Sequence, residues 1–165
     1  MAQLAPEWAK RDTKVIGISV DGIEDHKKWK KDIEAFAETD ASFPIIADQD
    51  LSVSKAYGML PGGHSLPEAA TPNDTATVRS VFIIGPDKQL KLTMTYPMNV
   101  GRNFAEVLRA LDGLQTAAGN GVATPANWNV GDDVVIPAPL SDADAEAKFG
   151  SFTKHFPYLR TTSLK

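Results

Sequence analysis

The first residue whose type and position could do chemistry is an arginine at the entrance to an apolar run. Arg79 stands just before Val81–Ile84 in the segment ATVRSVFIIGPDKQLKLTMTYP. A guanidinium keeps its charge in proteins and is rarely buried without a partner. Arg79 is therefore either an edge-strand arginine paired with a nearby acid or a cation directed at an anion. The residues alone leave both interpretations open.

The three histidines do not form a site. His26 falls on the apolar stripe of a predicted helix, which favours a packed or stacked histidine over a catalytic one. His64 lies in a loop rich in glycine and proline, and His155 lies near the C-terminus. None of them has the spacing of a metal site.

Paired acids recur along the chain, but they are better explained by turns and helix caps than by calcium. No loop has the ligand ladder, central glycine and terminal glutamate of an EF-hand. No nucleophile elbow, dinucleotide fingerprint or P-loop is present. The chain contains no cysteine, which excludes disulfides, thiolate metal sites and a cysteine nucleophile within it. The pairs are Asp48/Asp50, Asp132/Asp133 and Asp142/Asp144.

Composition indicates one ordinary globular domain, with room for a small appendage, in a chain of 165 residues. Hydrophobic residues make up 42% and charged residues 23%, with a net charge of -4. Basic residues are scattered, which argues against a nucleic-acid-binding protein. No apolar run approaches the roughly 20 residues of a membrane span. No secretory signal is evident at the N-terminus.

The elements that must position these side chains begin with two strands and two helices. Apolar runs predict strands over 13–21 and 43–49. Periodicity predicts helices over about 23–38 and 51–59. Asp21 and Glu24 have the spacing of a capping box. The segment 61–74, rich in glycine and proline, reads as a loop.

A hairpin and a longer helix follow. The turn residues Gly85–Lys88 join two strands, and Asn103 with Glu106 forms a second capping pair. An apolar stripe then predicts a helix ending near Gly119. This order of elements predicts an α/β fold, with a mixed sheet flanked by helices on both faces.

After Gly119 the composition changes. Only one short strand, Val134–Ile136, and one short helix are predicted there, the helix capped by Ser141 and Asp144. This region is too small to fold alone. We expect it to pack against the main domain or a partner subunit.

Several segments together resemble the 1-Cys peroxiredoxins of the peroxiredoxin-6 type. They are LAPEWAKRDTKVIGISVDGIEDHKKWKKDI, FPIIAD, VRSVFIIGPDKQLKLTMTYPMNVGRNFAEVLRALDGLQ, VATPANWNVGDDVVI and the late YLR. The resemblance covers nearly the whole chain, and the VATPANW segment is specific to this subgroup. It implies a thioredoxin-like core over 1–118, incomplete at its N-terminus, and a small C-terminal dimerisation domain over 119–165.

The resemblance also implies a reaction, the reduction of hydroperoxides by a peroxidatic cysteine. That cysteine would lie about seven residues before Met1, two helical turns away. Arg79 matches the family arginine that stabilises the thiolate and orients the peroxide, and Arg102 in PMNVGRNF matches a second one. A fixed guanidinium favours the thiolate, because an unperturbed cysteine is mostly protonated at neutral pH. Arg79 is then directed at a thiolate that this chain does not contain.

Further expectations follow from the resemblance. The substrates are a hydroperoxide and an external thiol or other reductant, with no cofactor, no metal, no nucleic acid and no membrane span. The protein is expected to be a homodimer, and the chain as given inactive alone. Cytoplasmic location is the default expectation and does not come from the resemblance. A lipase-like activity of some animal members has only Asp87 as a counterpart here, and a turn aspartate explains that residue better. The alternative of a different class is a non-catalytic dimerisation or binding module of thioredoxin fold.

Overall fold

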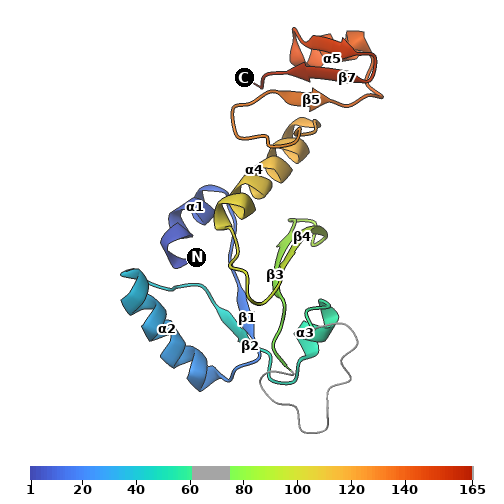
Figure 1. Ribbon diagram of the computed structural model, residues 1–165. Helices are drawn as coiled ribbons and strands as arrows, with labels where there is room; N and C mark the ends of the chain where they lie inside the picture. The colour runs from blue at the N-terminus through green and yellow to red at the C-terminus, as the bar shows by residue number, and fades with distance from the viewer. Residues whose placement is uncertain (61–74, 165) are drawn as a thin grey trace. The chain divides into compact units, whose positions relative to one another are not determined.

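The computed structural model describes residues 1–60 and 75–164, which form two compact units, Met1–Arg102 and Asn103–Lys165 (Figure 1). The first contains the short 3₁₀ turn η1 (Ala2–Leu4), α1 (Ala5–Lys10), β1 (Gly17–Ser19), α2 (Ile23–Ala37), β2 (Ile45–Ala47), α3 (Ser52–Ala56), β3 (Arg79–Ile84) and β4 (Leu90–Tyr96). The second contains α4 (Phe104–Asn120), β5 (Val134–Ile136), α5 (Asp142–Phe149), β6 (Thr153–Phe156) and β7 (Leu159–Thr162).

Strands β1 and β2 pair in parallel, with α2 as their connection, and Gly17 lies opposite Ile45. Both strands lie within the predicted segments but are shorter, and α2 agrees with prediction. The predicted capping box is wrong, because Gly22 is the N-cap residue and no side chain caps the helix. The carboxylate of Asp21 instead accepts a hydrogen bond from the Ser19 hydroxyl at 2.9 Å, and Glu24 pairs with Lys27.

The short helix α3 is held by a buried carboxylate. Asp48 is 2% exposed and accepts hydrogen bonds from the amides of Val53 and Ser54, at 3.0 and 2.7 Å. Burial by itself raises the pKa of Asp48, but the bonds from Ser54, Val53 and Ser52 outweigh it, so the pKa is lowered overall. The interpretation of this acid as a capping residue is confirmed.

The predicted hairpin is present as β3 and β4. Its turn is closed by a hydrogen bond from the Lys88 amide to the Gly85 carbonyl at 2.9 Å. One face of β3 packs toward the end of α3. There the rings of Phe82 and Tyr57 meet edge to face, with their centroids 4.9 Å apart. The described strands of this unit thus make one parallel and one antiparallel pair.

In the second unit, α4 begins at its predicted cap. The Asn103 side chain accepts hydrogen bonds from the amides of Ala105 and Glu106, at 3.0 and 3.3 Å. The Glu106 carboxylate binds Arg109. Val107 and Leu111 of the predicted stripe are buried. A neighbouring cluster contains the buried residues Val122, Trp128 and Val134.

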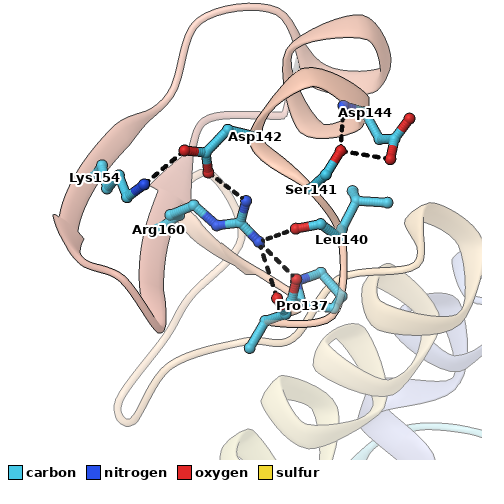
Figure 2. A network of polar contacts seen from close by, with 8 residues as sticks. Pro137, Leu140, Ser141, Asp142, Asp144, Lys154 and Arg160 are labelled. Carbon is cyan, nitrogen blue, oxygen red and sulfur yellow. Dashed lines mark hydrogen bonds and ion pairs between the residues drawn. The ribbon is translucent and has the colours of Figure 1, made fainter.

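A three-stranded sheet with the order β5–β7–β6 completes the second unit. Only β5 was predicted, so the expectation of a single strand in this region is wrong. The Ser141 cap of α5 is confirmed, with the Asp144 amide at 3.1 Å from its hydroxyl. Figure 2 shows the adjoining network around Arg160, which is 2% exposed.

The Arg160 guanidinium binds the segment that leads into α5. It donates to the carbonyls of Pro137 and Leu140 at 2.9 and 2.6 Å and to the Asp142 carboxylate at 2.8 Å. The other oxygen of Asp142 accepts from Lys154 at 2.6 Å (Figure 2). One buried arginine therefore joins β7 to the start of α5.

The first unit leaves large apolar side chains exposed. On α2, Trp29 is 51% exposed and Phe36 95% exposed, although both recur with His26 at the helical spacing that predicted this helix. The pattern identified the apolar face of α2 correctly, but the described residues leave the Trp29 and Phe36 side chains on that face largely uncovered. Within 1–60 and 75–164, no helix has the length and apolar character needed to cross a membrane.

Candidate functional site

The open end of the β3–β4 hairpin places Arg79 directly opposite Tyr96. Residues opposite each other on antiparallel strands share one face of the sheet. The next pair on this face is Val81 with Met94. The other face is fixed by Phe82 against Tyr57 and by a hydrogen bond between the Ser80 and Thr95 hydroxyls at 3.1 Å. Arg79 therefore lies at the charged end of an otherwise apolar face.

Arg79 has no acidic partner in the part of the chain that the structure describes. Its side chain is exposed, and no described carboxylate lies within ion-pair distance of it. Exposed arginines of this kind usually gain a little stability from a nearby acid. The interpretation of Arg79 as one half of a surface ion pair therefore has no support among the described residues.

Arg102 lies near Arg79. The chain leaves β4 at Tyr96, turns with a hydrogen bond from the Val100 amide to the Pro97 carbonyl at 3.0 Å, and reaches Arg102. Burial of the guanidinium, and then the positive charge of Arg79, lower the pKa of Arg102 below its ordinary value. Two like charges held close together produce a locally positive potential, which attracts an anion.

The remaining candidates from the sequence are structural residues where they are described. His26 is 8% exposed, and its Nε2 lies 2.6 Å from the Ser19 hydroxyl, whose proton is donated to Asp21. Asp87 accepts from the Gln89 amide and pairs with Lys91, as expected of a turn residue. His155 is exposed and bonds to Thr161, and His64 lies outside the described residues.

The sequence did not single out two residues that the structure makes notable: Tyr96, which lies opposite Arg79, and Trp8. Tyr96 could have been found by counting outward from the Gly85–Lys88 turn, since hairpin register follows from the turn. Trp8 has no sequence signal, because the feature that singles it out is a buried indole nitrogen without an acceptor. Within the described ranges, no group of three or more His, Asp or Glu side chains is placed to hold a metal ion.

Comparison with known proteins gives two family matches that follow each other along the chain. Residues 1–93 match the AhpC/TSA family, and residues 113–151 match the C-terminal domain of 1-Cys peroxiredoxin. The 102/103 division between the compact units lies between the two matches, whereas the predicted domain boundary at 118/119 lies inside the second match.

Curated relatives are similar over almost the entire chain. The mitochondrial peroxiredoxin PRX1 of Saccharomyces cerevisiae is 45% identical over 167 residues, covering 99% of this chain and 62% of the relative. The 1-Cys peroxiredoxin of Dictyostelium discoideum is 45% identical, covering 98% of this chain and 64% of the relative. Peroxiredoxin-6 of Rattus norvegicus is 46% identical, with 98% and 75% covered. The chain thus spans less than two thirds of the length of the first two relatives.

Two solved structures are also peroxiredoxins, like the curated relatives. The yeast mitochondrial 1-Cys peroxiredoxin has a TM-score of 0.88 at 44% identity, over 99% of this chain and 76% of that one. A cysteine-to-serine mutant of peroxiredoxin 6 from Arenicola marina has a TM-score of 0.88 at 38% identity, over 98% of this chain and 75% of that one. The expected thioredoxin-like α/β fold of the peroxiredoxins is confirmed. The chain therefore belongs to the 1-Cys peroxiredoxins of the AhpC/TSA family, and it contains no cysteine.

Proposed function

We propose that this chain forms most of a thiol peroxidase that reduces hydrogen peroxide and organic hydroperoxides. Its nucleophilic cysteine is supplied by polypeptide outside these 165 residues. Arg79 carries the proposal, because it is a cation without an acidic partner among the described residues and has a second arginine beside it. Family membership supports the assignment, since the relatives are peroxiredoxins.

In the proposed reaction, a cysteine thiolate attacks one oxygen of the peroxide as the O–O bond breaks. The sulfur is oxidised to sulfenic acid, and the other oxygen leaves as an alkoxide or hydroxide that takes up a proton. Arg79 and Arg102 stabilise the thiolate before the attack and the charge on the leaving oxygen during it. An external thiol then reduces the sulfenic acid, releasing water and forming a mixed disulfide that a second thiol resolves.

The experiment compares two forms of the protein. The 165-residue chain alone should show no thiol-dependent consumption of hydrogen peroxide. The native protein from its own cells should have an intact mass above 17.8 kDa and one reactive thiol. In that native form, Arg79→Gln should raise the thiol pKa, measured by the pH dependence of alkylation, and lower kcat/KM about a hundredfold.

Arg109→Gln is the matched control. Arg109 is bound to Glu106 and to the Trp128 carbonyl, so its replacement should leave the thiol pKa unchanged. Peroxide turnover by the cysteine-free chain that disappears with Arg79→Gln would refute the mechanism.

A non-catalytic binding or dimerisation module is the second candidate. Exposed apolar side chains favour it: Phe36 and Trp29 in the first unit, and Val130 at 72% and Tyr158 at 68% exposure in the second. Contiguous exposed apolar surface is typical of association sites. We propose homodimerisation through the C-terminal region, residues 119–165. Light scattering during size-exclusion chromatography tests it, and a well-behaved monomer at high concentration would remove this candidate.

Cytoplasmic location is likewise a proposal. One relative, from Saccharomyces cerevisiae, is named as mitochondrial. Fractionation of the source cells with detection of the native protein decides between the two compartments.

A further inference from the structure

Met98 is the most exposed of the four methionines in the chain. It is 48% exposed, whereas Met59 is 4% exposed and Met94 is half-buried on β4. Methionine is usually a core residue, and a thioether at the surface is open to oxidation by peroxides. In a chain without cysteine, Met98 is therefore the sulfur atom that a hydroperoxide in solution reaches most easily.

The position of Met98 along the chain links it to both arginines of the candidate site. Met98 is a central residue of the turn 97–100, which is closed by a backbone hydrogen bond of 3.0 Å. Such a turn brings the Cα atoms of its first and last residues within about 7 Å of each other. Tyr96, directly before the turn, lies opposite Arg79, and Arg102 follows two residues after it. The turn that carries Met98 therefore connects the partner strand of Arg79 to Arg102.

The surroundings of this turn are positively charged. Besides burial, the positive charge of Arg79 lowers the pKa of Arg102, so the two guanidinium groups lie close enough to interact. The sequence over 88–105, which contains the turn, has no aspartate or glutamate. Fixed guanidinium groups stabilise negative charge that develops on a nearby oxygen. A peroxide that reacts at Met98 would therefore lose its second oxygen in a favourable electrostatic environment.

We propose that Met98 is a site of reversible oxidation, at which a hydroperoxide converts the thioether to a sulfoxide with assistance from Arg79 and Arg102. The sulfur lone pair attacks one peroxide oxygen, and the new S–O bond forms as the O–O bond breaks. The sulfur is oxidised by two electrons and the peroxide is reduced. The other oxygen leaves as hydroxide or alkoxide, is stabilised by the guanidinium groups, and takes a proton from water.

This reaction is separate from the peroxidase reaction proposed above. It needs neither a cysteine nor a thiol, and each chain consumes one peroxide, so it is a single event and not turnover. Methionine sulfoxide reductases return the sulfoxide to the thioether. The oxidation turns a flexible apolar side chain beside two cations into a polar hydrogen-bond acceptor. Met98 would thus record exposure to peroxide in a form that the cell can erase.

The experiment treats the folded 165-residue chain with hydrogen peroxide, together with N-acetylmethionine amide as a fully exposed reference thioether. Peptide mass spectrometry follows the addition of one oxygen atom at each methionine over time. Met98 is only half exposed, so without assistance it should react more slowly than the reference. We expect it to react about fivefold faster, the effect of one additional hydrogen bond to the leaving oxygen. Met59 should stay unoxidised, and sulfoxide reductases should remove the oxygen from Met98.

Three variants test the role assigned to the arginine. Arg79→Gln should lower the Met98 rate to that of the reference or below, and the fold should tolerate it because Arg79 is exposed. Arg109→Gln is the matched control and should leave the rate unchanged, since Arg109 is bound to Glu106. Met98→Leu keeps the apolar volume and should remove the fast phase of oxygen addition.

Three results would overturn the proposal. The first is a Met98 rate below that of the reference thioether, which would mean that exposure alone governs its oxidation. The second is an equal rate in Arg79→Gln and in the unmodified chain. The third is a rate advantage that persists in urea after the chain has unfolded, which would show that the fold does not provide it.

Discussion

The carboxylate of Asp142 is shared by two cations of very different exposure, Arg160 at 2.8 Å and Lys154 at 2.6 Å. The Arg160 side chain is 2% exposed and the Lys154 side chain 47%. Arg160 also donates to the carbonyls of Pro137 and Leu140. The acid therefore neutralises a buried charge that organises the loop before α5, whereas its bond to lysine lies at the surface.

Replacement of Arg160, the buried partner of Asp142, should lower the stability of the folded chain. Arg160→Met leaves the Pro137 and Leu140 carbonyls without their donor, and the free energy of unfolding should fall by about 3 kcal/mol. Lys154→Ala is the control and should change stability little, since surface ion pairs contribute little. Urea unfolding followed by Trp128 fluorescence measures both. Equal losses in the two variants would mean that burial of Arg160 does not matter.

Stability should fall in acid partly through Asp48. Its pKa is lowered in the folded state, so its contribution is complete above the ordinary aspartate pKa. That contribution is lost as the pH falls through the lower, folded-state value. Asp48→Asn should lower stability at neutral pH by about 1–2 kcal/mol, as loss of a helix cap does.

Thermal unfolding from neutral to strongly acidic pH provides the measurement for Asp48. The melting temperature of the variant should depend less on pH than that of the unmodified chain. If the melting temperature of Asp48→Asn fell with pH as steeply as that of the unmodified chain, other carboxylates would account for the acid sensitivity.

Two glycines at the end of α4 should respond in opposite directions to alanine. Gly121 has φ +63°, and an added Cβ would lie 2.9 Å from Lys148 Nζ, so Gly121→Ala should cost about 1 kcal/mol. Gly119 is inside the helix, where an added Cβ meets no atom within 4 Å. Gly119→Ala should therefore stabilise the protein by about 0.5–1 kcal/mol. Differential scanning calorimetry of the two variants checks the signs.

Removal of the Arg79 charge should stabilise the chain slightly. The charge of Arg79 lowers the pKa of Arg102, so the two guanidinium groups repel each other. Arg79→Met should gain about 0.5 kcal/mol, and added salt should reduce the gain. Arg109→Met should instead destabilise, because Arg109 is paired with Glu106. A loss of stability in Arg79→Met would restore the interpretation of Arg79 as an ion-paired surface residue.

The parts predicted well from sequence are those fixed by neighbouring residues. The Gly85–Lys88 turn and the caps Asn103 and Ser141 depend on backbone groups a few positions away, and these are where they were expected. The capping box at Asp21 failed because Ser19, two residues earlier, competes for the same carboxylate. Hydrogen bonds between residues close in sequence therefore explain both the correct predictions and the failed one.

Features that depend on distant residues could not be predicted. Strand β6 is exposed throughout and has no alternating pattern, so only its pairing with β7 defines it. Periodicity gave α2 an apolar stripe but could not show that Phe36 would remain 95% exposed. The apolar groove beside α1 combines side chains from three separate segments: α1 itself, the residues before β1 and the residues before β2. For Arg79 and Arg102, the sequence identified both residues through a family resemblance, and their catalytic role stays a prediction.

The strand order β5–β7–β6 has a consequence for how the protein is made. The strand at the centre of this sheet, Leu159–Thr162, comes last in sequence among the three. During synthesis both outer strands leave the ribosome before the strand that joins them. The buried Arg160 arrives with that strand, so the segment from Pro137 to Asp142 lacks its anchor until then. The sheet therefore closes only after the chain has emerged past Thr162, and a nascent chain stalled before that point carries two unpaired edges.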